Sequence, residues 1–244
     1  MKKKVFLTSS LLLISALGFQ VTANGAEVAA YTSNGAIKFE ADTNPTNPVD
    51  PTDPEKPVDP VDPTDPDGPN PGTAGPLSID FASSFQFGKQ LITSETKDYY
   101  ADLQSFAASP DAPNYVQVTD KRGTQEGWSL SVVQNGQFKT ADDEALEGAA
   151  LSIANGSMTS ITDMQYAPTA TASHTFVPGS EVTLVNAEEG KGMGTWIYKF
   201  GADAAEGSEA VKLNVPGRSV KLAKEYRTTL TWKLNNVPEN TENE

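Results

Sequence analysis

The chain has 244 residues, with 18 Lys and Arg against 32 Asp and Glu for a formal net charge of −14, one His and no Cys. The missing cysteine excludes disulfides, a thiolate nucleophile and Cys-ligated metal sites, and a lone histidine excludes a metal site built from several His. The acidic balance argues against a nucleic-acid binder, which needs a basic surface to release phosphate counterions. We therefore expect no cofactor, no metal and no nucleic-acid partner.

Residues 1–26 have the pattern of a secretory signal peptide. Three lysines at positions 2–4 precede an apolar run at residues 5–19, and small residues follow at Ala23 and Ala26. Cleavage after either alanine fits the small-residue rule. We favour Ala26, which removes three lysines and no acid and leaves a formal charge of −17. No second apolar stretch reaches the ~20 residues that a membrane span needs, so we predict a secreted protein without a span.

Residues 236–244 are polar and acidic and contain no sorting-type Leu-Pro motif. We expect residues 239–244 to be an acidic tail. Covalent sortase attachment is not expected, so a chain retained at a cell surface would be held there non-covalently.

A Pro- and Asp-rich segment at residues 45–76 follows an N-terminal segment at residues 27–44. Prolines recur at every third position from Pro45 to Pro69, which matches the three residues per turn of polyproline II and puts the aspartates on a second edge. This pattern predicts a polyproline-type rod that is a solvated linker, a spacer or a ligand for an aromatic groove. Residues 35–40 alternate apolar and polar like a short strand. If that strand joins the main fold, the rod is instead a long loop inside the domain.

Residues 77–238 are predicted to form one all-β domain, a sandwich or barrel-like fold of short strands. Short apolar or alternating runs are separated by Gly, Pro, Asn and Asp. One stretch, residues 98–108, could be helical, since Tyr99, Leu103 and Phe106 would share a face. The candidate strands are residues 77–81, 115–119, 128–133, 151–154, 173–177, 181–186, 195–200, 211–215 and 226–234.

Two of these strands contain a Trp-x-Leu motif, Trp128-Ser129-Leu130 and Trp232-Lys233-Leu234. Alternation places Trp and Leu of each motif on one face of its strand, which is first of all a core pattern. An exposed indole would instead stack on a sugar ring or contact a protein partner. Trp196 has the same ambiguity, and Tyr198, opposite Ile197 in alternation, is a candidate for exposure.

With its paired motifs, the sequence resembles the WxL domain family of Gram-positive surface proteins. The resemblance also takes in residues 35–39, the Pro/Asp-rich insert, residues 75–79 and the C-terminal strand that ends before Pro238. It implies a secreted, cell wall-associated protein bound non-covalently to peptidoglycan through Trp128, Leu130, Trp232 and Leu234. It also implies a surface complex with co-encoded proteins, some of which bind a host or plant matrix.

Two alternatives to direct wall binding stay open. In the first, the chain is a subunit that binds a partner surface protein, by strand addition or an aromatic face, and reaches the wall or the host matrix only indirectly. In the second, it is a glycan-processing enzyme with unrecognised carboxylates. We expect no enzyme, because the paired acids lie in Gly- and Ala-rich loops and His174 has no nucleophile elbow beside it. Those acids are Asp142, Asp143, Glu144, Glu188 and Glu189.

Overall fold

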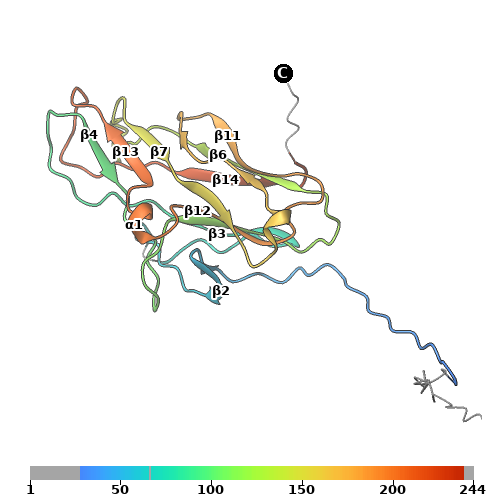
Figure 1. Ribbon diagram of the computed structural model, residues 1–244. Helices are drawn as coiled ribbons and strands as arrows, with labels where there is room; N and C mark the ends of the chain where they lie inside the picture. The colour runs from blue at the N-terminus through green and yellow to red at the C-terminus, as the bar shows by residue number, and fades with distance from the viewer. Residues whose placement is uncertain (1–27, 66, 239–244) are drawn as a thin grey trace, which may run out of the picture. The chain divides into compact units, whose positions relative to one another are not determined.

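The computed structural model describes residues 28–65 and 67–238, so the predicted signal peptide and acidic tail lie outside the described residues. In the described part, the strands form three four-stranded antiparallel sheets and one hairpin (Figure 1). Sheet I is β10 (His174–Thr175), β7 (Ala150–Ile153), β13 (Val211–Val215) and β4 (Lys97–Tyr100). Sheet II is β14 (Leu230–Asn235), β6 (Trp128–Gln134), β11 (Glu181–Ala187) and β9 (Thr169–Ala170). Sheet III is β3 (Leu77–Ala82), β5 (Tyr115–Asp120), β12 (Gly194–Phe200) and β8 (Gly156–Thr159).

The all-β prediction is confirmed, and a strand forms within each of the nine predicted ranges. The remaining elements are the hairpin strands β1 (Val49–Asp50) and β2 (Asp53–Pro57), and two short helical turns, η1 (Met164–Tyr166) and α1 (Ala204–Gly207). The predicted helical stretch at residues 98–108 is wrong. Its first residues belong to β4, where Tyr99 lies opposite Leu213 of β13. The edge of β13 supplies the backbone hydrogen bonds that a short isolated helix would have to form alone.

The predicted strand at residues 35–40 does not form. The structure assigns these residues no regular element, and the side chains of Ile37 and Phe39 are 80% and 85% exposed. A short alternating segment forms a strand only where the edge of a sheet supplies hydrogen-bond partners for its backbone N–H and C=O groups. The described residues up to Lys38 form a unit of their own, separate from the unit that begins at Phe39.

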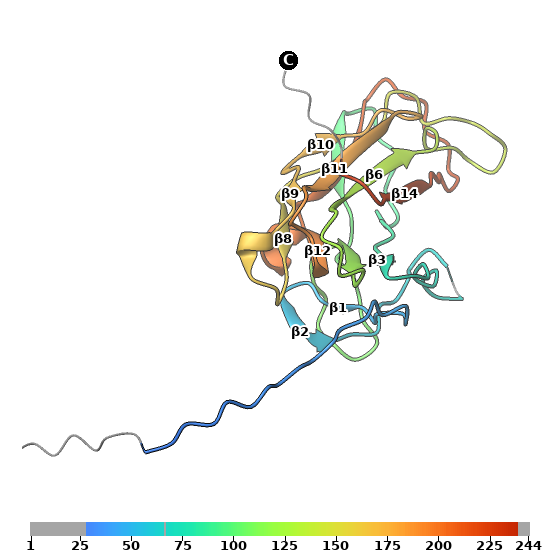
Figure 2. The ribbon, with the colours of Figure 1, turned by 90° about the vertical axis from the view of Figure 1, so that its right-hand side faces the viewer.

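One large core joins the three sheets, and Figure 2 shows β14, β6 and β11 above β12 and β3. Along β12, Trp196, Tyr198 and Phe200 point into this core, and the Trp196 indole N–H donates to the carbonyl of Met193 at 2.9 Å. The exposure suggested for Tyr198 is wrong, since it is 1% exposed and its hydroxyl donates to the carbonyl of Thr171 at 2.6 Å.

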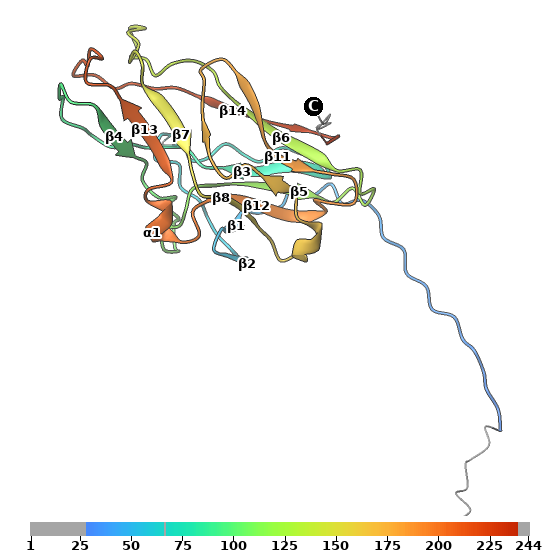
Figure 3. The same ribbon diagram turned by 45° about the horizontal axis from the view of Figure 1, so that its top comes forward.

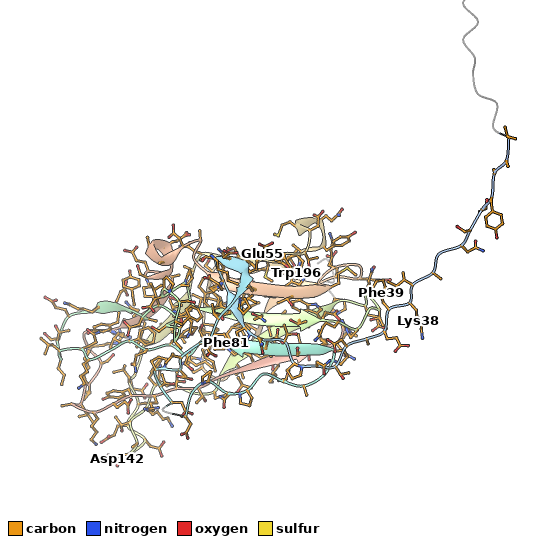
Figure 4. All side chains as sticks on the ribbon, turned by 90° about the horizontal axis from the view of Figure 1, so that it is seen from below. Lys38, Phe39, Glu55, Phe81, Asp142 and Trp196 are labelled. Atoms are coloured by element: carbon orange, nitrogen blue, oxygen red, sulfur yellow. The ribbon has the colours of Figure 1, made fainter. Side chains whose placement is uncertain are left out.

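A second, smaller core lies on the other face of sheet III. Ile197 of β12 belongs to it, so β12 is buried on both faces. The cover comes from the Pro/Asp-rich segment, whose Val49 and Val58 pack against this cluster. Figure 4 shows the hairpin that carries Glu55 lying across the sheet that contains Trp196 and Phe81. The members of the second core are Phe81, Phe106, Ala112, Tyr115 and Ile197.

The continuous polyproline rod does not form, because the segment turns back on itself as the β1–β2 hairpin. The aspartates that precede prolines close turns instead of forming an acidic edge. The carboxylates of Asp50 and Asp62 accept the backbone N–H of Thr52 and Thr64, both at 2.7 Å. Such Asx turns are a local alternative to extended chain. The segment is therefore a folded loop on the domain as far as these turns, not a spacer.

Two buried glutamines fasten this loop to the sheets. The Gln117 side chain accepts the N–H of Val49 at 2.9 Å and donates to the carbonyl of Asn47 at 3.0 Å. Gln104 donates to the carbonyl of Val61 at 2.9 Å. Proline lacks an N–H and cannot support a continuous ladder, so a side-chain amide, with one donor group and one acceptor, takes the place of a neighbouring strand.

Replacement of Gln117 by leucine should cost about 2–4 kcal/mol of unfolding free energy. The change keeps the volume but leaves the Val49 N–H and the Asn47 carbonyl without partners. Urea unfolding measures the loss. The matched control is Gln90→Leu, since Gln90 is exposed and bonds only locally to Phe87. Equal stability of the two variants would contradict this role for Gln117.

Asp80 of β3 lies beneath the same loop with its carboxyl 6% exposed. It accepts hydrogen bonds from Thr119, Ser78 and Gln117 at 2.6, 2.7 and 2.9 Å. Burial raises the pKa of Asp80 above 3.8, against the lowering effect of those bonds. An acid whose pKa is raised on folding stabilises the folded state most below the unfolded pKa, and this contribution is lost as the pH rises through the folded pKa.

Asp80→Asn should therefore be more stable than the wild type at pH 7, with the gain disappearing near pH 3. Asparagine can accept from Thr119 and Gln117 and donate to the Ser78 hydroxyl. The control is Asp98→Asn, because the hydrogen bond from Asn214 and the pairing with Lys212 lower the pKa of Asp98. That variant should lose stability at pH 7. Urea titrations at both pH values test the opposite signs, and a shared sign would contradict the assignment.

Candidate functional site

The two Trp-x-Leu motifs lie side by side in sheet II. Strands β6 and β14 pair antiparallel, with Leu130 opposite Leu234 and Val132 opposite Trp232 (Figure 3). Residues directly opposite in an antiparallel pair share a face of the sheet. All four residues singled out from the sequence, Trp128 included, therefore lie on one face, which is the face turned toward the core.

Trp128 is a core residue and not an exposed platform. Its side chain is 0% exposed, and its indole N–H donates to the carbonyl of Gly192 at 2.9 Å. Gly192 has a φ of +77°, and a Cβ on it would lie 2.4 Å from the indole nitrogen of Trp128. The turn at Gly192 closes over the indole only because this position lacks a side chain.

The second motif is more accessible because β14 is an edge strand. Leu130 is fully buried, whereas Trp232 and Leu234 are half-buried. Asn135 donates its backbone N–H to the Thr229 carbonyl. By the alternation of an antiparallel ladder, the N–H groups of Leu230, Trp232 and Leu234 then point outward. In the described residues no strand pairs with that outer edge.

An open apolar cleft of about 1540 Å³, the edge cleft, runs beside β14. Its walls come from β14, β3, residues 83–92 and residues 221–229. The irregular segment 83–92 is anchored by two aromatic rings, since Phe85 packs edge-on against Phe200 and Phe87 against Phe138, both with ring centres 6.2 Å apart. The cleft thus gives access to the outer part of the core at the second motif.

Arg122 ties the ends of the two motif strands together. It forms a bidentate ion pair with Asp120, with contacts of 2.7 and 3.0 Å. It also donates to the carbonyl of Gly127, just before β6, at 2.6 Å and to that of Asn236, just after β14, at 3.1 Å. The hydrogen bond to Asp120 raises the pKa of Arg122 further above neutral. Sequence reasoning missed this residue because its loop position gives no signal of the distant carbonyls.

The acids considered for catalysis are surface groups. Lys224 donates to Asp142 and to Glu144, both at 2.8 Å, and its hydrogen bond lowers the pKa of Glu144. His174 packs edge-on against Phe176, and burial lowers the pKa of its imidazole. Within residues 28–65 and 67–238, no cluster of three or more His, Asp and Glu side chains could hold a metal ion. No helix in that part is long and apolar enough to cross a membrane.

Gly192→Ala should destabilise the protein by about 2–4 kcal/mol, because the new methyl group meets the buried indole of Trp128. Gly190→Ala is the matched control. Its φ is +82°, but no atom lies within 4 Å of a Cβ there, so it should cost only about 1 kcal/mol of backbone strain. Thermal unfolding compares the two. Equal losses would show that the contact with Trp128 does not restrict this turn.

One of three comparisons with known proteins identifies a family for this chain. A family model described as "WxL domain surface cell wall-binding" matches residues 26–238, nearly the whole chain. A search of curated proteins and a search of solved structures each found no match. The family match confirms the resemblance and the expected cell wall-associated location at the surface. The chain belongs to the WxL family of surface cell wall-binding domains.

Proposed function

We propose that this protein is held on the Gram-positive cell wall by non-covalent contacts to peptidoglycan, as a binding protein and not as an enzyme. The observation that carries this proposal is the match of a cell wall-binding family model to residues 26–238. The fold supports it, because the candidate catalytic acids are exposed. Asp142 and Glu144 are paired with Lys224.

The burial of the first motif separates its role from that of the second. Trp128 and Leu130 have no exposed surface with which to touch a glycan. Their part is to fix sheet II, on which every other surface depends. Trp232 and Leu234 are half-buried. Trp232 lines the edge cleft and is the motif residue that a ligand in this cleft can reach.

Charge sets a further condition on wall binding. The mature chain, with a formal charge of −17 after loss of three lysines, is repelled by anionic wall polymers such as teichoic acids. Retention then depends on short-range contacts. Salt screens the repulsion over distances beyond about 10 Å at 0.1 M, so added salt should leave binding unchanged or strengthen it.

A second function, binding of a partner surface protein, is favoured by the edge of β14. Its outward N–H groups can donate hydrogen bonds to the carbonyls of an added strand, and the edge cleft offers apolar surface to alternate side chains of that strand. A chain of this kind would join a surface complex with co-encoded proteins. Through that complex it would also reach a host or matrix protein.

The mature chain should bind protein-free peptidoglycan sacculi saturably. Its affinity should not decrease when the salt concentration is raised from about 50 to about 300 mM, an increase that weakens complexes held by opposite charges. Pull-down quantifies the bound fraction. The same assay on walls that keep their proteins gives the second arm. Trp232→Ala tests the edge cleft, and Lys233→Ala, on the opposite face of β14, is its control.

Each outcome points to one function. Binding to both preparations supports direct retention. Binding only to the protein-bearing walls, with loss in Trp232→Ala, supports the partner protein and contradicts direct peptidoglycan contact. Release of reducing sugar from the sacculi would contradict the assignment as a binding protein.

A further inference from the structure

A polar cleft of about 450 Å³ lies on sheet I, away from the Trp-x-Leu motifs. Register places Thr175 of β10, Ser152 of β7, Lys212 of β13 and Tyr100 of β4 directly opposite one another in a row across all four strands. The next row along the strands, with Ile153 and Val211, faces the core. The Thr175–Tyr100 row therefore lies on the solvent side, with a span of roughly 14 Å for three strand spacings.

The side chains of this cleft combine one accessible ring with several short polar groups. Tyr100 is 44% exposed although it lies in a strand. Ser152, Ser173 and Thr175 line the same hollow, and their hydroxyls can donate and accept hydrogen bonds there. An aromatic ring stacks on the C–H face of a sugar, and hydroxyl groups bond its oxygens, so this set of groups fits a carbohydrate.

The charges in and around the cleft argue against an anionic ligand. Lys212 lies 3.2 Å from the carboxylate of Asp98, which also accepts a hydrogen bond from Asn214 at 2.6 Å. The positive charge is thus matched locally, and Glu209 adds a carboxylate to the rim. A neutral ligand with many hydroxyl and amide groups suits this balance better than a phosphate or a carboxylate.

The cleft is built on a rigid base. Its row of residues lies on hydrogen-bonded strands whose opposite side packs in the large core. Side chains on strands hold their positions better than side chains on loops, which lowers the entropy lost on binding. This rigidity matters for a weak ligand such as a sugar, whose contacts are few.

We propose that the polar cleft of sheet I binds one or two N-acetylated sugar rings of the wall glycan, with Tyr100 as the stacking surface. The proposal rests on the proposed wall-binding function and names the surface that carries it. Peptidoglycan contact is then made by sheet I, whereas the edge cleft at Trp232 stays available to a protein partner.

Nuclear magnetic resonance of the mature chain with an N-acetylglucosamine tetramer gives the first test. His174 is the single histidine of the sequence. It precedes Thr175 in β10, a strand that borders the polar cleft, and its ring packs against Phe176. Its ring C–H signals therefore report on this strand without any label. Titration should shift these signals saturably. A tetramer of galacturonic acid, which is anionic and lacks acetamido groups, should not shift them.

Variants in the sacculus pull-down give the second test. Tyr100→Ala removes the stacking ring, and Thr175→Trp fills the cleft with a large side chain. Each variant should weaken binding about tenfold or more. Two controls lie outside the cleft. Tyr31→Ala removes another exposed tyrosine, and Lys233→Ala changes an exposed side chain on a strand of sheet II. Circular dichroism and thermal unfolding confirm that all four variants fold.

The outcomes separate this inference from the function on which it rests. Wild-type binding that survives in both cleft variants overturns the polar cleft and leaves wall retention intact. A wild-type chain that does not bind sacculi overturns both. Loss of binding in the cleft variants alone, together with the His174 shift, supports the site.

Discussion

The pairing of β6 with β14 holds the domain together, because it joins a strand from the middle of the chain to the last strand. Leu130 and Leu234 meet across this pair and bury the face on which Trp128 also lies. Trp128 in turn supports the turn at Gly192 through its indole N–H. Arg122 closes the open end of the pair through two backbone carbonyls. A substitution that disrupts this pairing would therefore destabilise all three sheets, since they share one core.

The outer face of sheet III carries an apolar cluster with Phe81, Tyr115 and Ile197, and the Pro/Asp-rich segment covers it. Proline fixes the backbone and lowers the entropy lost when the loop is ordered. It also removes donors that a ladder would need. Gln117 and Gln104 compensate with side-chain amides, and the valines of the loop add the apolar contacts. The segment is thus part of the fold, although its composition is that of a linker.

Sequence patterns located the strands of the core well, since alternation and turn residues are local signals. They placed the Trp and the Leu of each motif on one face of its strand, and the pairing of β6 with β14 brings the two motifs together. They failed where contacts are distant. Period three in proline predicted a rod, yet the valines between the prolines met an apolar sheet face. The spacing of Tyr99, Leu103 and Phe106 suggested a helix, but the edge of β13 received a strand. Nothing local to Arg122 or Gln117 reveals the backbone groups that they bind.

The same geometry explains how a motif can define a family through the fold that it builds. Trp-x-Leu supplies large apolar side chains at alternate positions, and in this chain two copies must fit one another and Gly192. This fit restricts which side chains these positions can carry. Sheet I carries accessible groups on its outer face, while its inner face, with Leu151 and Leu213, packs in the core. Burial of Trp128 and Leu130 and exposure of Tyr100 are then two results of one arrangement, in which the inward faces of the strands form the core and the outward faces stay accessible.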